Sequence, residues 1–335
     1  QLHVKPGEPL DPERLNRNLN MIYGMGDFQQ VSYSLVEEDG KTGLVVEATQ
    51  RHIGPNTLDF GLVLGANMKG DSSFNLSVAY TMSQLNALGG QWRNFIQVGD
   101  HIKLETDFYQ PLDAAQEYFI NPYFSYQRYN LDLFNDSNQD NARFRTSRAN
   151  IGLEVGRNLE RWGRLSLGLR YGSGNNDLRF GQISTNANTI NEGNFDDGGY
   201  SIRWAAYTLD NLNFPTSGFH GNLTFYDSLT ALGASNNFST LSLNAARAYT
   251  WGKQTLIPRV ILSGRLSGDL DVQDRFRLGG FLNLSGYQVG QISGQYAGLG
   301  QLIYMYRLDN ASAAFTLPLY AGGSLEVGGA WDEID

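Results

Sequence analysis

The residues that could carry acid–base or nucleophilic chemistry are few in this chain and lie far apart. A serine nucleophile on a strand-to-helix turn needs the pattern G-x-S-x-G, and the two nearest matches, Gly70–Ser72 and Gly233–Ser235, lack the final glycine. His220 lies close to Ser217, but a turn beside the start of a strand explains this pair better than catalysis. The histidines have no metal-ligand spacing; they are His3, His52, His101 and His220. We therefore expect no catalytic site, no metal and no cofactor in this segment.

A second set of side chains with chemical potential consists of arginines on the polar faces of predicted strands. Where strands close around a water-filled lumen, such residues either pair with Asp and Glu across the lumen or create an electric field for a passing molecule, and we expect pairing. They are Arg148, Arg170, Arg203, Arg259 and Arg265. The net charge of -9 argues against nucleic acid as a partner, because phosphate binding requires clustered Lys and Arg.

The elements that position these arginines are segments of about ten residues in which apolar and polar residues alternate. In the segment 165–172, Leu165, Leu167, Leu169 and Tyr171 alternate with small or charged residues. Such a strand presents one face to lipid and the other to water. The mean hydropathy is -0.35, and no apolar run approaches the roughly 18 residues of a membrane helix. A soluble β-sandwich is the alternative, but its strands are usually shorter. The pattern indicates an antiparallel transmembrane β-barrel.

Alternation and turn residues together predict thirteen strands. Bacterial single-chain barrels close with an even number of strands, so we expect residues 54–335 to form a barrel that is incomplete at its C-terminus. The expected strands are 57–68, 72–84, 91–99, 101–110, 118–133, 143–157, 163–176, 198–210, 218–231, 237–251, 254–268, 297–309 and 315–331.

Residues 1–52 do not follow the barrel pattern. Asp11 and Pro12 are typical of a helix start, and the helix that we expect there ends before Gly24. Two β-rich runs, Phe28–Val36 and Gly43–Thr49, then predict a hairpin. Because the unit has too little core to stand alone, we interpret it as part of an α+β domain cut at its start.

Residues 269–294 form a gap that is too long for a hairpin turn. A loop of this length is usually functional or disordered, and a disordered loop would not carry several large apolar residues. We therefore expect the loop to pack inside the lumen. The apolar anchors expected are Phe276, Phe281, Leu284 and Tyr287, and the glycines that allow tight backbone paths are Gly279, Gly280 and Gly286.

The sequences of these segments resemble the superfamily of BamA and the two-partner-secretion transporters. Residues 10–48 resemble the second half of a POTRA domain, and the loop resembles the family motif F-x-L-G-G followed by R-G-Y or R-G-F. The motif residues here are Phe276, Leu278, Gly279, Gly280, Phe281, Leu284, Ser285, Gly286 and Tyr287. The resemblance implies sixteen strands and a loop arginine that pairs with an acidic residue on the thirteenth strand.

This chain departs from that pattern at the arginine. Ser285 stands in its place, and Glu326 aligns with the acidic partner. The family ion pair cannot form, and a hydrogen bond from Ser285 to Glu326 is the weaker substitute that we expect. Residues 207–221 also resemble a turn of these barrels, with Asp210, Pro215 and Gly218 at the turn positions, and a structural role explains them.

The sequence Leu-Ser-Gly-Tyr at residues 284–287 is most similar to the patatin-like type V secretion family. This resemblance implies an outer-membrane translocator of a Gram-negative bacterium, with its POTRA domain in the periplasm. It exports or displays an N-terminal passenger, a patatin-like phospholipase whose catalytic domain lies upstream. The alternatives are an outer-membrane protein assembly factor and a two-partner secretion transporter. Expected partners are outer-membrane lipids and the passenger, and whether two copies pair stays open.

Overall fold

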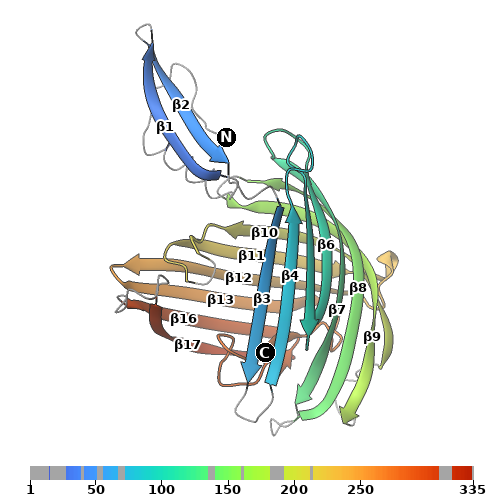
Figure 1. Cartoon of the computed structure of the whole chain (residues 1–335). Helices are drawn as coiled ribbons and strands as arrows, with labels where there is room; N and C mark the ends of the chain where they lie inside the picture. The colour runs from blue at the N-terminus through green and yellow to red at the C-terminus, as the bar shows by residue number, and fades with distance from the viewer. Residues whose placement is uncertain are drawn as a thin grey trace.

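The chain folds into one large antiparallel β-sheet and a separate two-stranded hairpin (Figure 1). The computed structural model describes residue 15 and residues 28–38, 41–50, 56–66, 72–134, 140–159, 162–181, 192–211, 214–308 and 319–333. The hairpin consists of β1 (Phe28–Glu38) and β2 (Lys41–Gln50), which pair along their whole length. This confirms the predicted hairpin. Of the predicted helix, only Leu15 lies within the described residues, and it is helical and buried.

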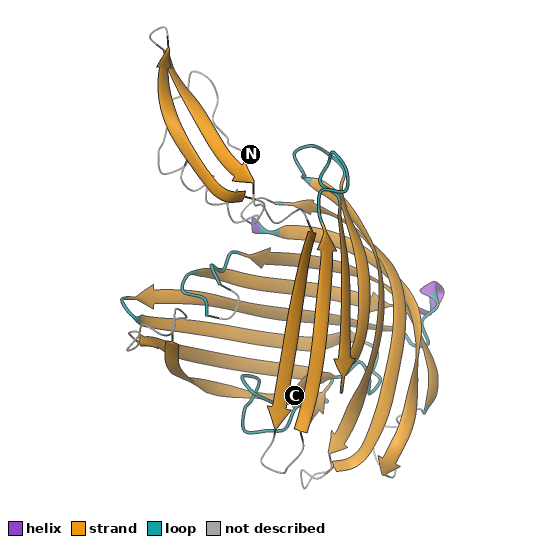
Figure 2. Ribbon diagram, in the orientation of Figure 1, coloured by secondary structure: helices purple, strands orange, loops and turns teal. Residues whose placement is uncertain are grey.

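In the part of the chain that the structure describes, the large sheet has thirteen strands, as predicted, and each pairs antiparallel with the next strand of the sheet along the chain. Within the described ranges the sheet stays open between β3 and β17, which are its two edge strands. In the ribbon view the strands curve around a common interior (Figure 2). The strands are β3 (Asn56–Ala66), β4 (Ser72–Met82), β5 (Gln91–Gly99), β6 (Ile102–Pro111), β7 (Tyr118–Phe134), β8 (Asp140–Asn158), β9 (Arg164–Gly181), β10 (Gly193–Tyr207), β11 (Gly218–Ser228), β12 (Phe238–Trp251), β13 (Gln254–Ser267), β16 (Tyr296–Leu308) and β17 (Leu319–Trp331).

The predicted alternation is visible in the exposure of successive side chains along β9. Leu167 is 54% exposed on the outer face, whereas its neighbour Ser166 is only 4% exposed on the inner face. An outer face rich in exposed Leu, Ile, Val and aromatic side chains is what a lipid environment requires. Among the described residues, no helix is both long and apolar enough to cross a membrane.

Strands β8, β9 and β10 are longer than the alternation predicted. The ladder between β9 and β10 continues through Asn176 and Gly193, beyond the last alternating apolar residue. Backbone hydrogen bonds hold a ladder together whatever the side chains are, so the strands extend through polar stretches that the apolar pattern does not mark.

Two short elements lie in the connection between β13 and β16. They are β14 (Phe276–Leu278) and β15 (Ile292–Gly294), which pair with each other. The sequence pattern predicted one loop without strands in this connection. It is instead a loop closed at its neck by a small hairpin, and this organisation positions the site described next.

Candidate functional site

The connection between β13 and β16, residues 268–295, folds back onto the inner face of the sheet, as predicted. At its neck the side chain of Gln295 accepts a hydrogen bond from the backbone N–H of Leu270 at 2.8 Å and donates one to the Leu270 carbonyl at 3.1 Å. Both residues are buried. These reciprocal bonds hold the two ends of the loop together. We call residues 270–277 the loop base and residues 281–287 the loop tip.

The loop base packs against the wall formed by β7 and β8. Val272 is buried in a cluster with Leu131 of β7 and Phe144 of β8. The guanidinium of Arg277 donates to the carbonyl of Asp132 at 3.1 Å, and Asn176 of β9 donates to Gln273 at 3.1 Å. The loop base is therefore attached to three consecutive strands.

Buried charges complete this attachment. Arg148 of β8 donates to Asp274 at 2.6 Å and lies 3.8 Å from Asp197 of β10. Asp197 also accepts hydrogen bonds from Arg170 at 2.9 Å and from the hydroxyl of Tyr226 at 2.7 Å. A charged side chain inside a protein is tolerated when it is paired and hydrogen-bonded. The network joins the loop base to β8, β9, β10 and β11.

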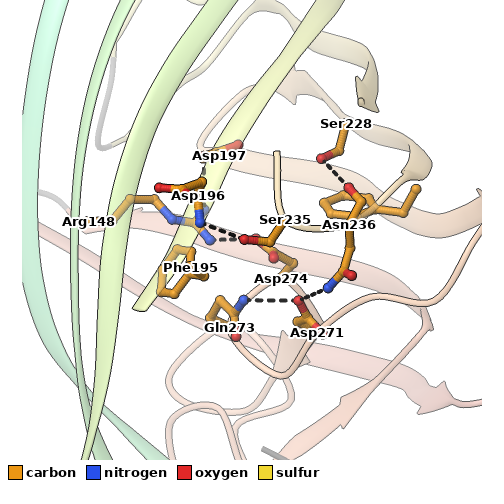
Figure 3. Close-up of a pocket in the computed structure, with 11 residues that line it drawn as sticks. Arg148, Phe195, Asp196, Asp197, Ser228, Ser235, Asn236, Asp271, Gln273 and Asp274 are labelled. Carbon is orange, nitrogen blue, oxygen red and sulfur yellow. Dashed lines mark hydrogen bonds and ion pairs between the residues drawn. The ribbon is translucent and has the colours of Figure 1, made fainter. Parts of the chain in front are cut away.

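A small cavity beside Arg148 lies where this network meets the turn between β11 and β12 (Figure 3). There Asn236 donates to Asp271 of the loop base at 2.7 Å, and Ser235 accepts a hydrogen bond from the backbone N–H of Asp196 at 2.8 Å. The turn between β11 and β12 is thus hydrogen-bonded to the loop base. Among the described residues, no group of three or more His, Asp or Glu side chains is arranged to hold a metal ion.

The loop tip contacts the opposite part of the sheet, on β13, β16 and β17. The backbone N–H of Ser285 donates to Oε2 of Glu326 at 2.7 Å, and its hydroxyl lies 3.1 Å from Oε1 and 3.2 Å from Oε2. Gln301 of β16 donates to both the Leu282 carbonyl and Glu326 at 3.1 Å. The predicted hydrogen bond between Ser285 and Glu326 is confirmed, and a backbone bond that the sequence did not reveal accompanies it.

The apolar anchors of the loop are only partly those that the sequence predicted. Leu284 is 7% exposed and packs with Leu278 in a cluster that includes Leu299 of β16, and Phe276 borders the cluster. Phe281 is instead 88% exposed, and Tyr287 is also exposed, so the prediction that these two rings anchor the loop is wrong. The reason lies in the backbone: the tip turns sharply, with Leu284 at a φ of 68°, so that Leu284 and not Phe281 enters the cluster.

The motif glycines have different roles. Gly279 has a φ of 124°, and a Cβ there would meet the Gln288 carbonyl oxygen at 1.9 Å. Gly280 also has a positive φ, of 102°. Gly286 has neither property, because its φ is not positive and a Cβ there would meet nothing within 4 Å. Close backbone approach therefore requires glycine at position 279, and the positive φ favours glycine at position 280.

Two of the other three predicted arginines pair with a carboxylate, but both partners lie close by along the sheet or the chain and not across the lumen. Arg203 pairs with Glu154 at 2.9 Å, and Arg265 pairs with Asp269. Arg259 is different, because it donates to Asn244 at 3.3 Å and to the Leu282 carbonyl at 3.5 Å. Among the described residues no carboxylate lies within ion-pair distance of Arg259, so the predicted pairing is not present there.

The turn between β10 and β11 matches its motif. Asp210 accepts hydrogen bonds from the backbone N–H groups of Thr216 at 2.8 Å and Ser217 at 3.0 Å. Desolvation raises the pKa of the Asp210 carboxyl, but the Thr216 hydroxyl and these N–H groups lower it more, so its pKa lies below the ordinary value. Pro215 is buried, and Gly218 has a φ of 99°. These contacts close the turn and support its structural role.

Comparisons with known proteins place the fold. The model of the Omp85 superfamily domain matches residues 94–327. BamA from Haemophilus ducreyi lacking POTRA domains 1–3 has a similar structure, with a TM-score of 0.65 and 14% identity over 99% of this chain and 68% of that chain. CdiB from Acinetobacter baumannii has a TM-score of 0.57 and 12% identity over 98% of this chain and 63% of that chain.

CdiB from Escherichia coli is similar with a TM-score of 0.59 and 15% identity, covering 91% of this chain and 58% of that chain. The chain thus spans less than two thirds of the length of either CdiB structure. At these identities the likeness shows the fold. No curated protein sequence matches the chain significantly.

Proposed function

Because this chain belongs to the Omp85 superfamily, whose model matches residues 94–327, we propose that it is the translocator part of an exporter and that its docked loop closes the lumen at rest. The chain is an outer-membrane β-barrel protein of a Gram-negative bacterium and acts in protein translocation, outer-membrane protein assembly or two-partner secretion. The barrel domain of this superfamily is not itself an enzyme, and no catalytic activity is assigned to this segment.

The observation that carries the proposal is the attachment of one loop to both sides of the sheet. The loop base is fixed to β7–β10, whereas Ser285 at the tip is hydrogen-bonded to Glu326 of β17. A loop fixed in this way crosses the interior. An exporter that must keep small molecules out while idle needs such a closure, and passage of a polypeptide would require its displacement.

We propose further that the passenger is an N-terminal patatin-like phospholipase, as in the type V proteins whose loop wording this chain resembles. Ser285 in place of the family arginine supports this choice. Residues 1–52 would then be the second half of a POTRA domain in the periplasm. The likeness to the BamA structure, which extends over 99% of the chain and so includes nearly all of this segment, supports that assignment.

The experiment uses intact cells of a Gram-negative host that produce the full-length protein. If the proposal is right, a phospholipase activity appears at the cell surface and is removed by external protease, while periplasmic markers stay intact. The matched control deletes only the loop residues 281–287. Surface activity that disappears when the segment upstream of this chain is removed supports the proposal. A passenger that stays in the periplasm overturns it.

The alternative is an assembly factor, which the structural likeness to BamA favours. It predicts a different result, because depletion of the protein would then lower the amounts of many other outer-membrane barrels. A two-partner transporter would instead export a separate polypeptide. Quantifying the outer-membrane proteome after depletion separates these cases from export of the chain's own passenger.

A further inference from the structure

Two consecutive loop residues of opposite charge contact opposite parts of the large sheet. Asp274 accepts a hydrogen bond from Arg148 of β8 at 2.6 Å. Arg275, the next residue, forms an ion pair at 3.1 Å with Asp332, which directly follows β17. Six strands lie between β8 and β17 in the sheet, namely β9, β10, β11, β12, β13 and β16. One dipeptide is therefore attached to two distant walls.

A local turn gives these neighbouring side chains their different directions. The backbone N–H groups of Asp274 and Arg275 both donate to the carbonyl of Asp271, at 2.8 Å and 3.1 Å. This fixes the backbone of both residues on the same short turn. Asn236 also donates to the side chain of Asp271 at 2.7 Å, which ties this turn to the connection between β11 and β12.

The two ion pairs differ in their surroundings. The side chains of Arg148 and Asp274 are 11% and 16% exposed, so salt screens this pair little. Arg275 is buried as well, but the side chain of Asp332 is 53% exposed. The second pair is therefore weaker and more sensitive to salt than the first.

We propose that Asp274 and Arg275 are positioning residues that form a charged brace, which holds the loop across the lumen from β8 to the end of β17. The brace rests on the proposed role of the loop as a lumenal closure. The charged residues of the brace lie in the loop base, whereas the family motif has an arginine at the position of Ser285 in the tip. Of the two pairs of the brace, the exposed Asp332 pair breaks first, and the buried Arg148 pair limits full release.

The test is a charge exchange in the full-length protein, followed by single-channel recording in planar lipid bilayers. The double variant Asp274→Arg, Arg275→Asp places like charges against both walls, and this repulsion is expected to raise the open probability. The expected rise is about tenfold, which corresponds to about 1.4 kcal/mol. Adding Arg148→Asp and Asp332→Arg reverses both walls and restores the closed state. A double variant that conducts like the unmodified protein overturns the brace, and so does an exchange on the walls that fails to restore closure.

A second variant keeps the test decisive if the charge exchange prevents folding, which a lost heat-dependent gel shift would show. Asp332→Asn removes one exposed partner, and Glu333→Gln removes the same charge one residue later. Only Asp332→Asn is expected to increase opening, about threefold at low salt, and the increase disappears at high salt because exposed charges are screened. Equal behaviour of the two variants overturns the brace.

Display of the passenger is measured in the same variants. Changed conductance with unchanged display leaves the brace standing and contradicts the proposed function instead. Unchanged conductance with working export contradicts the brace alone. The two ideas therefore fail in different ways.

Discussion

The base and the tip of the lumenal loop are held by opposite kinds of contact. The base is fixed by buried charges, with Asp274 of the loop facing Arg148 of the wall. The tip is fixed by one buried leucine, Leu284, and by exposed hydrogen bonds from Ser285 to the Glu326 carboxylate. Buried ion pairs are costly to break once formed, whereas exposed hydrogen bonds contribute little. The loop thus has a firm base and a releasable tip.

The largest expected effect is at the base. Asp274→Ala leaves Arg148 buried without its nearest carboxylate, and the docked loop should lose about 4 kcal/mol relative to the undocked one. Hydrogen exchange of peptides from residues 270–277 measures the loss. The control is Asp269→Ala, which removes the 84% exposed partner of Arg265 and should change exchange little. Equal exchange in both variants would contradict the firm base.

The second effect separates the two apolar residues of the tip. Leu284→Ala removes a side chain buried against Leu278 and Leu299, and it should destabilise docking by about 2 kcal/mol. Phe281→Ala removes a larger side chain that is almost fully exposed, so it should leave exchange of the tip peptides unchanged. If the phenylalanine variant were the more damaging one, the tip would be anchored differently from the structure.

A smaller effect is expected at the hydrogen bonds of the tip. Ser285→Ala removes the hydroxyl but keeps the backbone N–H that donates to Glu326 at 2.7 Å, so docking should weaken by under about 1 kcal/mol. Protease cleavage within residues 281–287 on folded protein measures it. Glu326→Gln loses the charge that strengthens both bonds and should be cleaved faster than Ser285→Ala. The reverse order would mean that the hydroxyl, and not the carboxylate, holds the tip.

The smallest effect is a gain. Ser285→Arg restores the residue that the family pattern has at this position and allows an ion pair with Glu326. Because the site is exposed, the pair should add only about 0.5 kcal/mol of docking free energy, and added salt should abolish it. Single-channel recording at two salt concentrations checks this. A strong, salt-resistant closure would show that the tip can become as firm as the base.

Much of the fold followed from the sequence because strand alternation is a local property. Leu165, Leu167 and Leu169 point outward in the structure as their spacing predicted, and all thirteen strands of the sheet were foreseen. The position of the long loop followed for the same reason, since it is the place where alternation stops. The hydrogen bond between Ser285 and Glu326 was predicted through the family resemblance and is present.

The contacts of the loop base did not follow from the sequence. Arg148 was expected to pair inside the lumen, but its partner Asp274 lies 126 residues later, in a loop whose charged residues look like solvent-exposed ones. Asp332 likewise gave no sign that it meets Arg275. The prediction for Phe281 was wrong, because a large apolar side chain was expected to be buried and this one is exposed.

The sequence by itself determined the period-two strands, their order and the place where a loop interrupts them, since each depends on residues close together in the chain. The tertiary structure alone decided what the loop touches. The curvature of the sheet and the turn at Asp271 send Asp274 and Arg275 to opposite walls, and the sharp backbone at Leu284 turns Phe281 outward. Such choices depend on how distant strands meet in space, and no local pattern records that.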